Sequence, residues 1–354
     1  MHMADALVSP AVAVTMYAAS AAAAGVSLVQ LHKEETAAPE LAKKKLPTMA
    51  VMSALVFAGQ MINYTIPGTG SSGHLCGGML LSAILGPWAG FLSMIVILAI
   101  QALFFADGGL LALGANVWNM AFYGCFVGYF LIYRPLMQGK LLSGKGRTKL
   151  VLASVLGCVV TLQLGALSVV VETSLSGITA LPFGAFAALM QPIHLAIGLV
   201  EGGITAAVLL FVYQTRPELL QCASAGAKNR CSRRATLAIL AAAALVIGGG
   251  LSLLASANPD GLEWSLFGNE EAGYSANMGL DEEAYGAESA AAEKAAAVQE
   301  KTSFLPDYGF ADSDSAAGTS VSGIVGCVIV AGLAGLICLA GSLAQKKKKQ
   351  AAAG

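Results

Sequence analysis

Eight apolar stretches, each long enough for a helix crossing about 30 Å of hydrocarbon, constrain the fold of this chain more than any other feature. They run over 8–31, 48–66, 76–105, 110–133, 150–172, 191–214, 236–256 and 321–344. Hydrophobic residues make up 56% of the 354 residues and charged residues only 12%, about half the charged share of a soluble domain. The sequence therefore predicts an all-α fold, a polytopic bundle of membrane helices surrounded by lipid.

Charged residues are distributed unevenly, and this predicts the topology. Basic residues cluster in 32–47, 134–149, 215–235 and 346–349, whereas 258–320 holds 13 of the 21 acids. Basic loops stay cytoplasmic, so an even number of spans must separate the first two clusters. The stretch 76–105 must then divide at Gly86-Pro87, since proline ends or kinks a helix. We expect about nine helical elements, one of them a short broken helix, with the N-terminus outside and the C-terminus inside.

This topology brings the polar features of the chain to the outer side. They comprise Met1, the loop 67–74, Asp107, the loop 173–190 and the acidic segment 258–320. Within the acidic segment, the Ala-, Glu- and Ser-rich stretch 284–300 has a composition typical of a mobile region.

The loop Gly68–His74 reads GTGSSGH and satisfies the dinucleotide pattern G-x-G-x-x-G. A P-loop needs Lys and Ser or Thr after its last glycine, and here His74 and Leu75 follow. A Rossmann loop belongs to a βαβ unit, which these apolar stretches do not resemble. We therefore interpret the loop as a flexible backbone that presents a histidine. The chain also lacks a complete Walker A sequence, so any ATP hydrolysis is expected in other subunits.

His2 is a candidate metal ligand because of its position. The first helix has no Lys or Arg before Lys33, unlike a secretory signal, so we expect the chain to begin at Met1. The α-amine, the amide of His2 and its imidazole can then form two fused chelate rings. Square-planar nitrogen sites select Ni²⁺ or Cu²⁺, with Co²⁺ possible, and His74 can supply the fourth nitrogen. The alternative is that His2 is an incidental terminal residue.

Other polar residues lie in or near the apolar stretches. His194 and Glu201 are seven residues apart, on one face of a predicted helix. Ionisable groups in spans usually face a cavity or a partner, so this pair either orients a ligand, lines an ion path or forms a structural hydrogen bond. The same alternatives apply to Asp107, Asn116 and Glu172. His32, beside Lys33, is interpreted as a solvated interfacial residue.

Several motifs resemble one family of membrane proteins. They are MHMADALVSP, IPGTGSSGHLCGG, LGPWAG, QALFFADGGLLALGANVWNM and QPIHLAIGLVEG. They occur in order over about 1–220 and are similar to the CbiM/NikM family, the substrate-capture (S) components of energy-coupling-factor (ECF) transporters for cobalt and nickel. The remainder, with Pro259-Asp260-Gly261-Leu262-Glu263, resembles the accessory N component that carries a PDGLE motif.

The resemblance implies a capture domain over 1–220 and an accessory region over 221–354. The accessory region would contain a helix over 236–256, the acidic extracytoplasmic loop 258–320 and a helix over 321–344. In the family the metal is held by groups that correspond to Met1, His2 and His74. The loop GTGSSGH departs from the commoner GTSGH-like form, which leaves the path of the loop open.

The resemblance further implies a prokaryotic cell-membrane protein without catalytic activity or cofactor. Its cargo would be Ni²⁺ or Co²⁺, with a slight preference for nickel, and its partners a membrane coupling (T) subunit and cytoplasmic P-loop ATPases. Nucleic acid is not among the expected partners. Two alternatives stay open: a stand-alone permease driven by an ion gradient, with His194 and Glu201 in a proton relay, and an intramembrane metalloenzyme.

Overall fold

The computed structural model describes residues 1–138, 146–178, 181–222, 229–274, 289–311 and 315–351. Parts of four predicted loops lie outside the described residues. These are 139–145 in the second basic cluster, 179–180 in the loop 173–190, 223–228 in the third basic cluster, and 275–288 with 312–314 in the acidic segment.

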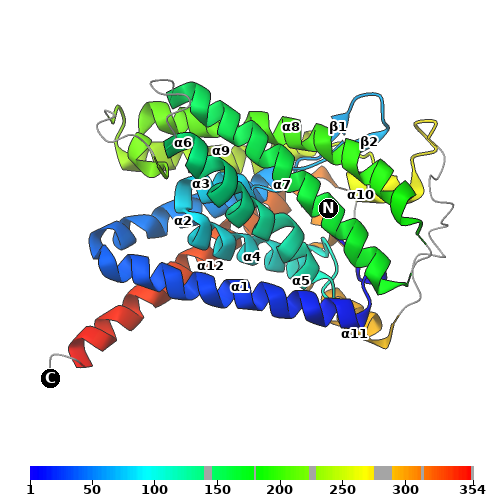
Figure 1. The fold of residues 1–354 in the computed structure, drawn as a ribbon, viewed down its shortest axis with the longest axis horizontal. Helices are drawn as coiled ribbons and strands as arrows, with labels where there is room; N and C mark the ends of the chain where they lie inside the picture. Colours follow the sequence, from blue (N-terminus) through cyan, green and yellow to red (C-terminus); the bar gives the residue numbers. More distant parts are fainter. Residues whose placement is uncertain (139–145, 179–180, 223–228, 275–288, 312–314, 352–354) are drawn as a thin grey trace.

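Helices account for nearly all of the regular structure (Figure 1). The first part of the chain forms η1 Asp5–Leu7, α1 Pro10–Ala37, α2 Pro39–Gln60, α3 Gly78–Leu85, α4 Pro87–Phe105, α5 Leu113–Asn116, η2 Val117–Tyr133, α6 Arg134–Gln138, α7 Gly146–Ser176, α8 Phe183–Thr215 and η3 Pro217–Leu219. The last part forms α9 Arg233–Gly249, η4 Leu251–Leu254, α10 Gly261–Phe267, α11 Ala290–Thr302, η6 Pro306–Tyr308 and α12 Ala316–Ala351. The predicted all-α class is confirmed.

Six helices among the described residues are long and apolar enough to cross a membrane. They are Pro10–Ala37, Pro87–Phe105, Leu113–Gln138, Gly146–Ser176, Phe183–Thr215 and Ala316–Ile337. Their outer faces carry exposed large apolar side chains such as Val14, Leu131 and Leu175. A contiguous apolar surface of this kind is suited to lipid rather than to water. The protein is therefore a multi-pass membrane protein.

The break predicted at Gly86-Pro87 is present. Gly86 has a φ of 85° and separates α3 from α4, which begins at Pro87. A left-handed φ favours glycine, and proline at the first helical position loses no intrahelical hydrogen bond. All eight residues of α3 are buried, so this short helix lies in the centre of the bundle (Figure 1).

Helices α9 and α12 pack against the first part of the chain. Both α9 and α12 contact α2, and the thiol of Cys327 donates to the carbonyl of Ala54 at 3.5 Å. Where α9 and α12 cross, Gly248 faces Gly323 so closely that a Cβ on Gly323 would overlap the Gly248 backbone. Small residues at a crossing allow two membrane helices to approach in this way.

Three predicted boundaries differ from the structure. The stretch 48–66 is not one span, because α2 ends at Gln60 and residues 64–66 form a strand. The loop predicted over 173–190 is shorter, since α7 continues to Ser176 and α8 begins at Phe183. The helix predicted over 236–256 ends at Gly249, within a run of three glycines that weakens a helix.

The acidic segment is also more ordered than predicted. Where a mobile stretch was expected over 284–300, residues 290–302 form α11. Ser289 caps this helix by accepting from the amide of Ala292 at 3.1 Å. The side-chain amide of Gln299 donates to the carbonyls of Ala102 and Gly108, each at 2.8 Å. These contacts attach α11 to the end of α4.

Candidate metal-binding site

The N-terminal residues lie extended against the loop that follows α4. The Met3 amide donates to Asn116 Oδ1 at 2.7 Å, and Asn116 Nδ2 donates back to the Met3 carbonyl at 3.2 Å. The Gly109 amide donates to the same carbonyl at 2.9 Å. Asp5 accepts from the amide of Ala112 at 2.9 Å. The side chain of Asn116 thus substitutes for a neighbouring strand and fixes the register of the first residues.

Gly109 makes this close approach possible. A Cβ at this position would overlap Oδ1 of Asp5. The Asp-Gly-Gly sequence at 107–109 is therefore explained by the passage of the N-terminal segment over it.

A β-hairpin carries the second histidine. Strands β1 Tyr64–Ile66 and β2 Ser71–Gly73 pair antiparallel, and His74 follows β2 directly. Gly68 and Gly70 in the turn have φ values of 76° and 70°, which side chains other than glycine rarely adopt. The glycines thus shape a hairpin turn.

Glu201 on α8 anchors the chain just beyond His74. Its two carboxylate oxygens accept hydrogen bonds from the amides of Cys76 and Gly77, each at 2.9 Å. The Nδ1 atom of His74 lies 2.9 Å from the carbonyl of Leu75. A carbonyl only accepts, so Nδ1 is the donor and Nε2 keeps its lone pair.

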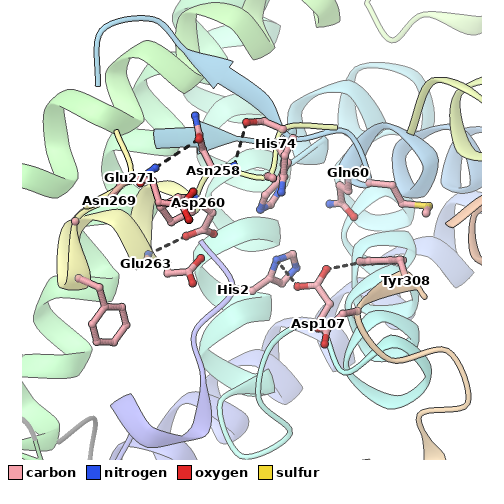
Figure 2. A pocket seen from close by; sticks show the side chains of 18 of the residues that line it. His2, Gln60, His74, Asp107, Asn258, Asp260, Glu263, Asn269, Glu271 and Tyr308 are labelled. Atoms are coloured by element: carbon pink, nitrogen blue, oxygen red, sulfur yellow. Dashed lines mark hydrogen bonds and ion pairs between the residues drawn. The ribbon is translucent and has the colours of Figure 1, made fainter. Parts of the chain in front are cut away.

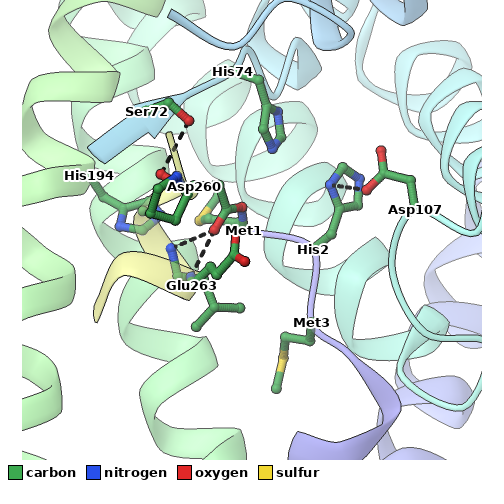
Figure 3. A network of polar contacts seen from close by, with 12 residues as sticks. Met1, His2, Met3, Ser72, His74, Asp107, His194, Asp260 and Glu263 are labelled. Carbon is green, nitrogen blue, oxygen red and sulfur yellow. Dashed lines mark hydrogen bonds and ion pairs between the residues drawn. The ribbon is translucent and has the colours of Figure 1, made fainter. Parts of the chain in front are cut away.

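His2 and His74 meet, although they come from different parts of the chain (Figure 3). Their rings stack with centroids 5.1 Å apart. His2 Nδ1 lies 3.1 Å from Oδ1 of Asp107, and Tyr308 donates its hydroxyl hydrogen to Oδ2 of Asp107 at 2.5 Å. His2 Nε2 is buried without a hydrogen-bond partner among the described residues, an arrangement that leaves a nitrogen lone pair available.

Burial keeps both rings neutral. Burial, together with the positive charge of the α-amine, lowers the pKa of His74 to about 4. Burial also lowers the pKa of His2, and the negative charge of Asp107 opposes this effect only in part. Because metal coordinates neutral imidazole, both side chains are in the protonation state of ligands at neutral pH.

The α-amine of Met1 lies between the two histidines and Asp260. Its nitrogen is 3.0 Å from Oδ2 of Asp260, a residue of the PDGLE sequence. Burial alone would raise the pKa of Asp260, but the positive charge of the amine, with hydrogen bonds from the Glu263 amide and the amine, brings this pKa below its ordinary value. The carboxylate is therefore ionised beside the terminal amine.

His2, His74 and Asp260 lie at the wall of a cavity of about 970 Å³ (Figure 2). His2 and His74 line it together with acidic side chains from both parts of the chain. These acids are Asp107, Asp260, Glu263, Glu270, Glu271 and Asp307. A concave surface lined by one sign of charge raises the local concentration of counter-ions, here cations.

The structure brings most of the sequence-predicted residues together. Met1, His2, His74 and Asp107 share one location, and Asn116 supports it through Met3. His194 lines a small cavity with Met1, His74 and Asp260, and its Nδ1 donates to the carbonyl of Met190 at 2.7 Å.

His194 and Glu201 are not bonded to each other: Glu201 binds the main chain after His74. The side chain of Glu172 accepts from Asn119 Nδ2 at 2.7 Å. Between these two described residues there is therefore no direct hydrogen bond, which was one of the alternatives drawn from the sequence.

Two residues at the site were not predicted, Asp260 and Tyr308. Both come from the accessory region, more than 200 residues from their partners in the chain. The PDGLE sequence was itself the available signal for Asp260, whereas nothing in the local sequence singles out Tyr308.

Side chains alone do not build a metal site here. Within the described parts of the chain, no three His, Cys, Asp or Glu side chains lie close enough together to hold a metal ion. A metal site at His2 and His74 would therefore need donors other than these four kinds of side chain.

Comparison with known proteins identifies the family of the chain. Residues 2–219 match the family described as the cobalt uptake substrate-specific transmembrane region, CbiM. The chain belongs to the CbiM family. Residues 234–342 match the PDGLE domain. The predicted resemblance of the last part of this CbiM-family protein to a component with a PDGLE motif is therefore confirmed.

Relatives with the same two parts cover most of the chain. A fused nickel transport protein NikMN of Rhodobacter capsulatus is 31% identical over 77% of this chain and 76% of its own length. A protein of Archaeoglobus fulgidus, assigned as a fused nickel transport protein NikMN, is 34% identical over 94% of this chain and 96% of its own length.

Cobalt transport protein CbiM of Sorangium cellulosum is 36% identical over 49% of this chain and 76% of its own length.

A solved structure supports the fold. A crystal structure of a transition metal transporter aligns with a TM-score of 0.51 and 34% identity, covering 60% of this chain and 93% of its own. These relatives are transport proteins rather than enzymes. The CbiM-family chain is accordingly a multi-pass membrane protein of a metal-transport family.

Proposed function

We propose that this protein captures Ni²⁺ or Co²⁺ on the extracytoplasmic side and passes it inward as the substrate-specific subunit of an ATP-driven ECF transporter. The observation that carries the proposal is the convergence of His2 and His74 at the wall of one acidic cavity, with the Met1 amine paired to Asp260 of the same wall. Four nitrogens are available there: the amine, the His2 amide and the two imidazoles.

Binding at this location requires a local rearrangement of His2. The nitrogen that closes a six-membered chelate ring with the residue's own amide is Nδ1, and in the structure Nδ1 faces Asp107. The ring must exchange this contact for the metal. His74 needs no such change of partner, because its Nδ1 donates to Leu75 and its Nε2 is free to bind.

Nickel is the favoured cargo. A planar set of four nitrogens is the geometry that Ni²⁺ and Cu²⁺ prefer among divalent first-row ions. The fused relatives that share both parts of this chain carry the name of nickel transport proteins. The four-nitrogen plane also leaves little room for a metal-bound water, which a hydrolytic metalloenzyme would need.

The energy for transport is proposed to come from partners. The sequence lacks a complete Walker A motif, which a nucleotide-hydrolysing subunit would use to hold the phosphates and Mg²⁺. A membrane coupling subunit and cytoplasmic P-loop ATPases would supply this activity.

Elemental analysis of the purified protein, after equilibration with equal nickel and cobalt, tests the cargo. We expect one metal ion per chain, predominantly nickel, and loss of this ion in His2→Ala and His74→Ala. Uptake in cells that express the chain with an inactivated partner ATPase tests the energy source. Uptake that persists at the full rate would favour a gradient-driven permease instead.

A further inference from the structure

The PDGLE sequence forms one border of the site. The carbonyl of Pro259 accepts a hydrogen bond from the Ser72 amide at 2.8 Å, so residues 258–260 lie beside β2 as a short parallel neighbour. The hydroxyl of Ser72 donates to the carbonyl of Asn258 at 2.8 Å. The accessory region therefore pairs with the hairpin that carries His74.

Two further contacts fix this border. Asn269 Nδ2 donates to the carbonyl of Gly70 at 2.8 Å, and the hydroxyl of Tyr274 donates to the carbonyl of Gly68. On the opposite side, a Cβ on Gly261 would lie 2.7 Å from Ile193 on α8. The first turn of α10 is thus held between the hairpin and α8, and only glycine permits this distance.

Asp260 divides its two oxygens between two tasks. Oδ1 caps α10 by accepting from the amides of Leu262 and Glu263 at 2.8 and 2.9 Å. Oδ2 is left for the Met1 amine at 3.0 Å. Because the cap bonds orient the carboxylate, Oδ2 has a fixed direction toward the amine.

The charge of Asp260 suits a bound cation. Of the four proposed nitrogen ligands, only the amide can become negative on losing its proton, so a divalent ion would leave a net positive charge. A buried charge is costly unless it is compensated. An amine that binds a metal through its lone pair keeps two hydrogens, so one of them can still donate to Oδ2.

We infer that Asp260 is a positioning residue of the metal site, which orients the α-amine of Met1 and compensates the charge of the bound ion. The accessory region then completes the site instead of only packing beside it. This inference rests on the proposed function, because it assigns a role to Asp260 at that same location. The species that Asp260 faces is a divalent cation held by nitrogen ligands.

The test compares Asp260→Asn with Glu300→Gln in the full-length protein. Asparagine is as good an N-cap as aspartate, so the substitution keeps α10 while removing the charge. Glu300 is exposed on α11 and lies outside the lining of the cavity, so Glu300→Gln removes an equal charge without changing the contact to Met1. Nickel affinity is measured by competition with a chromophoric chelator. We expect Asp260→Asn to bind at least tenfold more weakly and Glu300→Gln to bind within twofold of the unaltered protein.

A second measurement needs no metal. Acylation of the Met1 amine by a small activated ester, followed by mass spectrometry, reports whether Asp260 holds that amine. Asp260→Asn should accelerate the reaction, and Glu300→Gln should not. Unchanged acylation, or unchanged nickel affinity in a folded Asp260→Asn protein, would overturn the inference.

His2→Ala, measured in parallel, separates the two ideas. If His2→Ala retains nickel, the proposed function fails. If it loses nickel while Asp260→Asn does not, only the role of Asp260 fails.

Discussion

The imidazole rings of His2 and His74 stack with their planes inclined by 21°. This relationship joins the first residues of the chain to the end of a hairpin. It places two neutral nitrogen donors beside the terminal amine, within a cavity lined by acids.

The first prediction concerns pH. The pKa of His74 is about 4 in the folded protein, below its ordinary value near 6.5. Between these values the unfolded chain binds a proton that the folded chain does not. The contribution of His74 to the free energy of unfolding is therefore complete above about pH 6.5 and falls toward pH 4, by on the order of 3 kcal/mol.

Thermal unfolding of the metal-free protein in detergent, from pH 7.5 to pH 4, measures this effect. His74→Gln should unfold with a shallower dependence on pH, and His32→Gln should match the unaltered protein. An identical pH dependence in His74→Gln would contradict the account.

The second prediction concerns Glu201. Glu201→Gln keeps the size of the side chain but removes the charge that accepts from the Cys76 and Gly77 amides. Hydrogen bonds to charged groups contribute about 1.5–3 kcal/mol, so the chain after His74 should loosen and nickel affinity should fall about tenfold.

Glu172→Gln is the matched control for Glu201→Gln. Glu172 is also buried in a helix, but its partner is Asn119 and not the hairpin segment. Equal effects of the two substitutions on affinity would show that Glu201 acts through general stability alone.

The third prediction concerns the path of the N-terminal segment. Gly109→Ala introduces a methyl group where Asp5 lies, and it should displace residues 1–5 without altering any proposed ligand. Gly203→Ala, on α8, adds the same methyl group into open space. We expect at least a tenfold loss of nickel affinity for Gly109→Ala and no change for Gly203→Ala, measured by the same chelator competition.

The fourth prediction concerns topology. Single cysteines at 177 and 263, in a cysteine-free background, should react with a membrane-impermeant reagent added outside intact cells. Cysteines at 38 and 218 should react only after the membrane is opened. Labelling of 218 from outside would contradict the orientation inferred from the basic clusters.

Local chemistry made part of this structure predictable. The Gly86-Pro87 break follows from two residues with strong backbone preferences, and the tight turn before His74 follows from its glycines. The helical stretches were also predictable from the sequence, because the thickness of the bilayer sets the length of an apolar span.

The long-range partners were not predictable in the same way. Asp260 reaches the Met1 amine across 259 positions, and no local pattern specifies that pairing. Similarly, Glu201 was noted for its spacing from His194, yet it binds the main chain of the hairpin segment instead. Such contacts depend on how separate elements pack, which sequence periodicity does not encode.

The position of a short affinity tag determines whether the Met1 amine is a metal ligand. If the Met1 amine is a ligand, residues added before Met1 convert it into an amide, which is far less basic and is displaced from the chelate ring. Nickel binding by the N-terminally tagged protein should then be lost, whereas the same tag after Gly354 should leave it unchanged, as should His32→Ala. Nickel bound equally tightly by the N-terminally tagged protein would contradict the account.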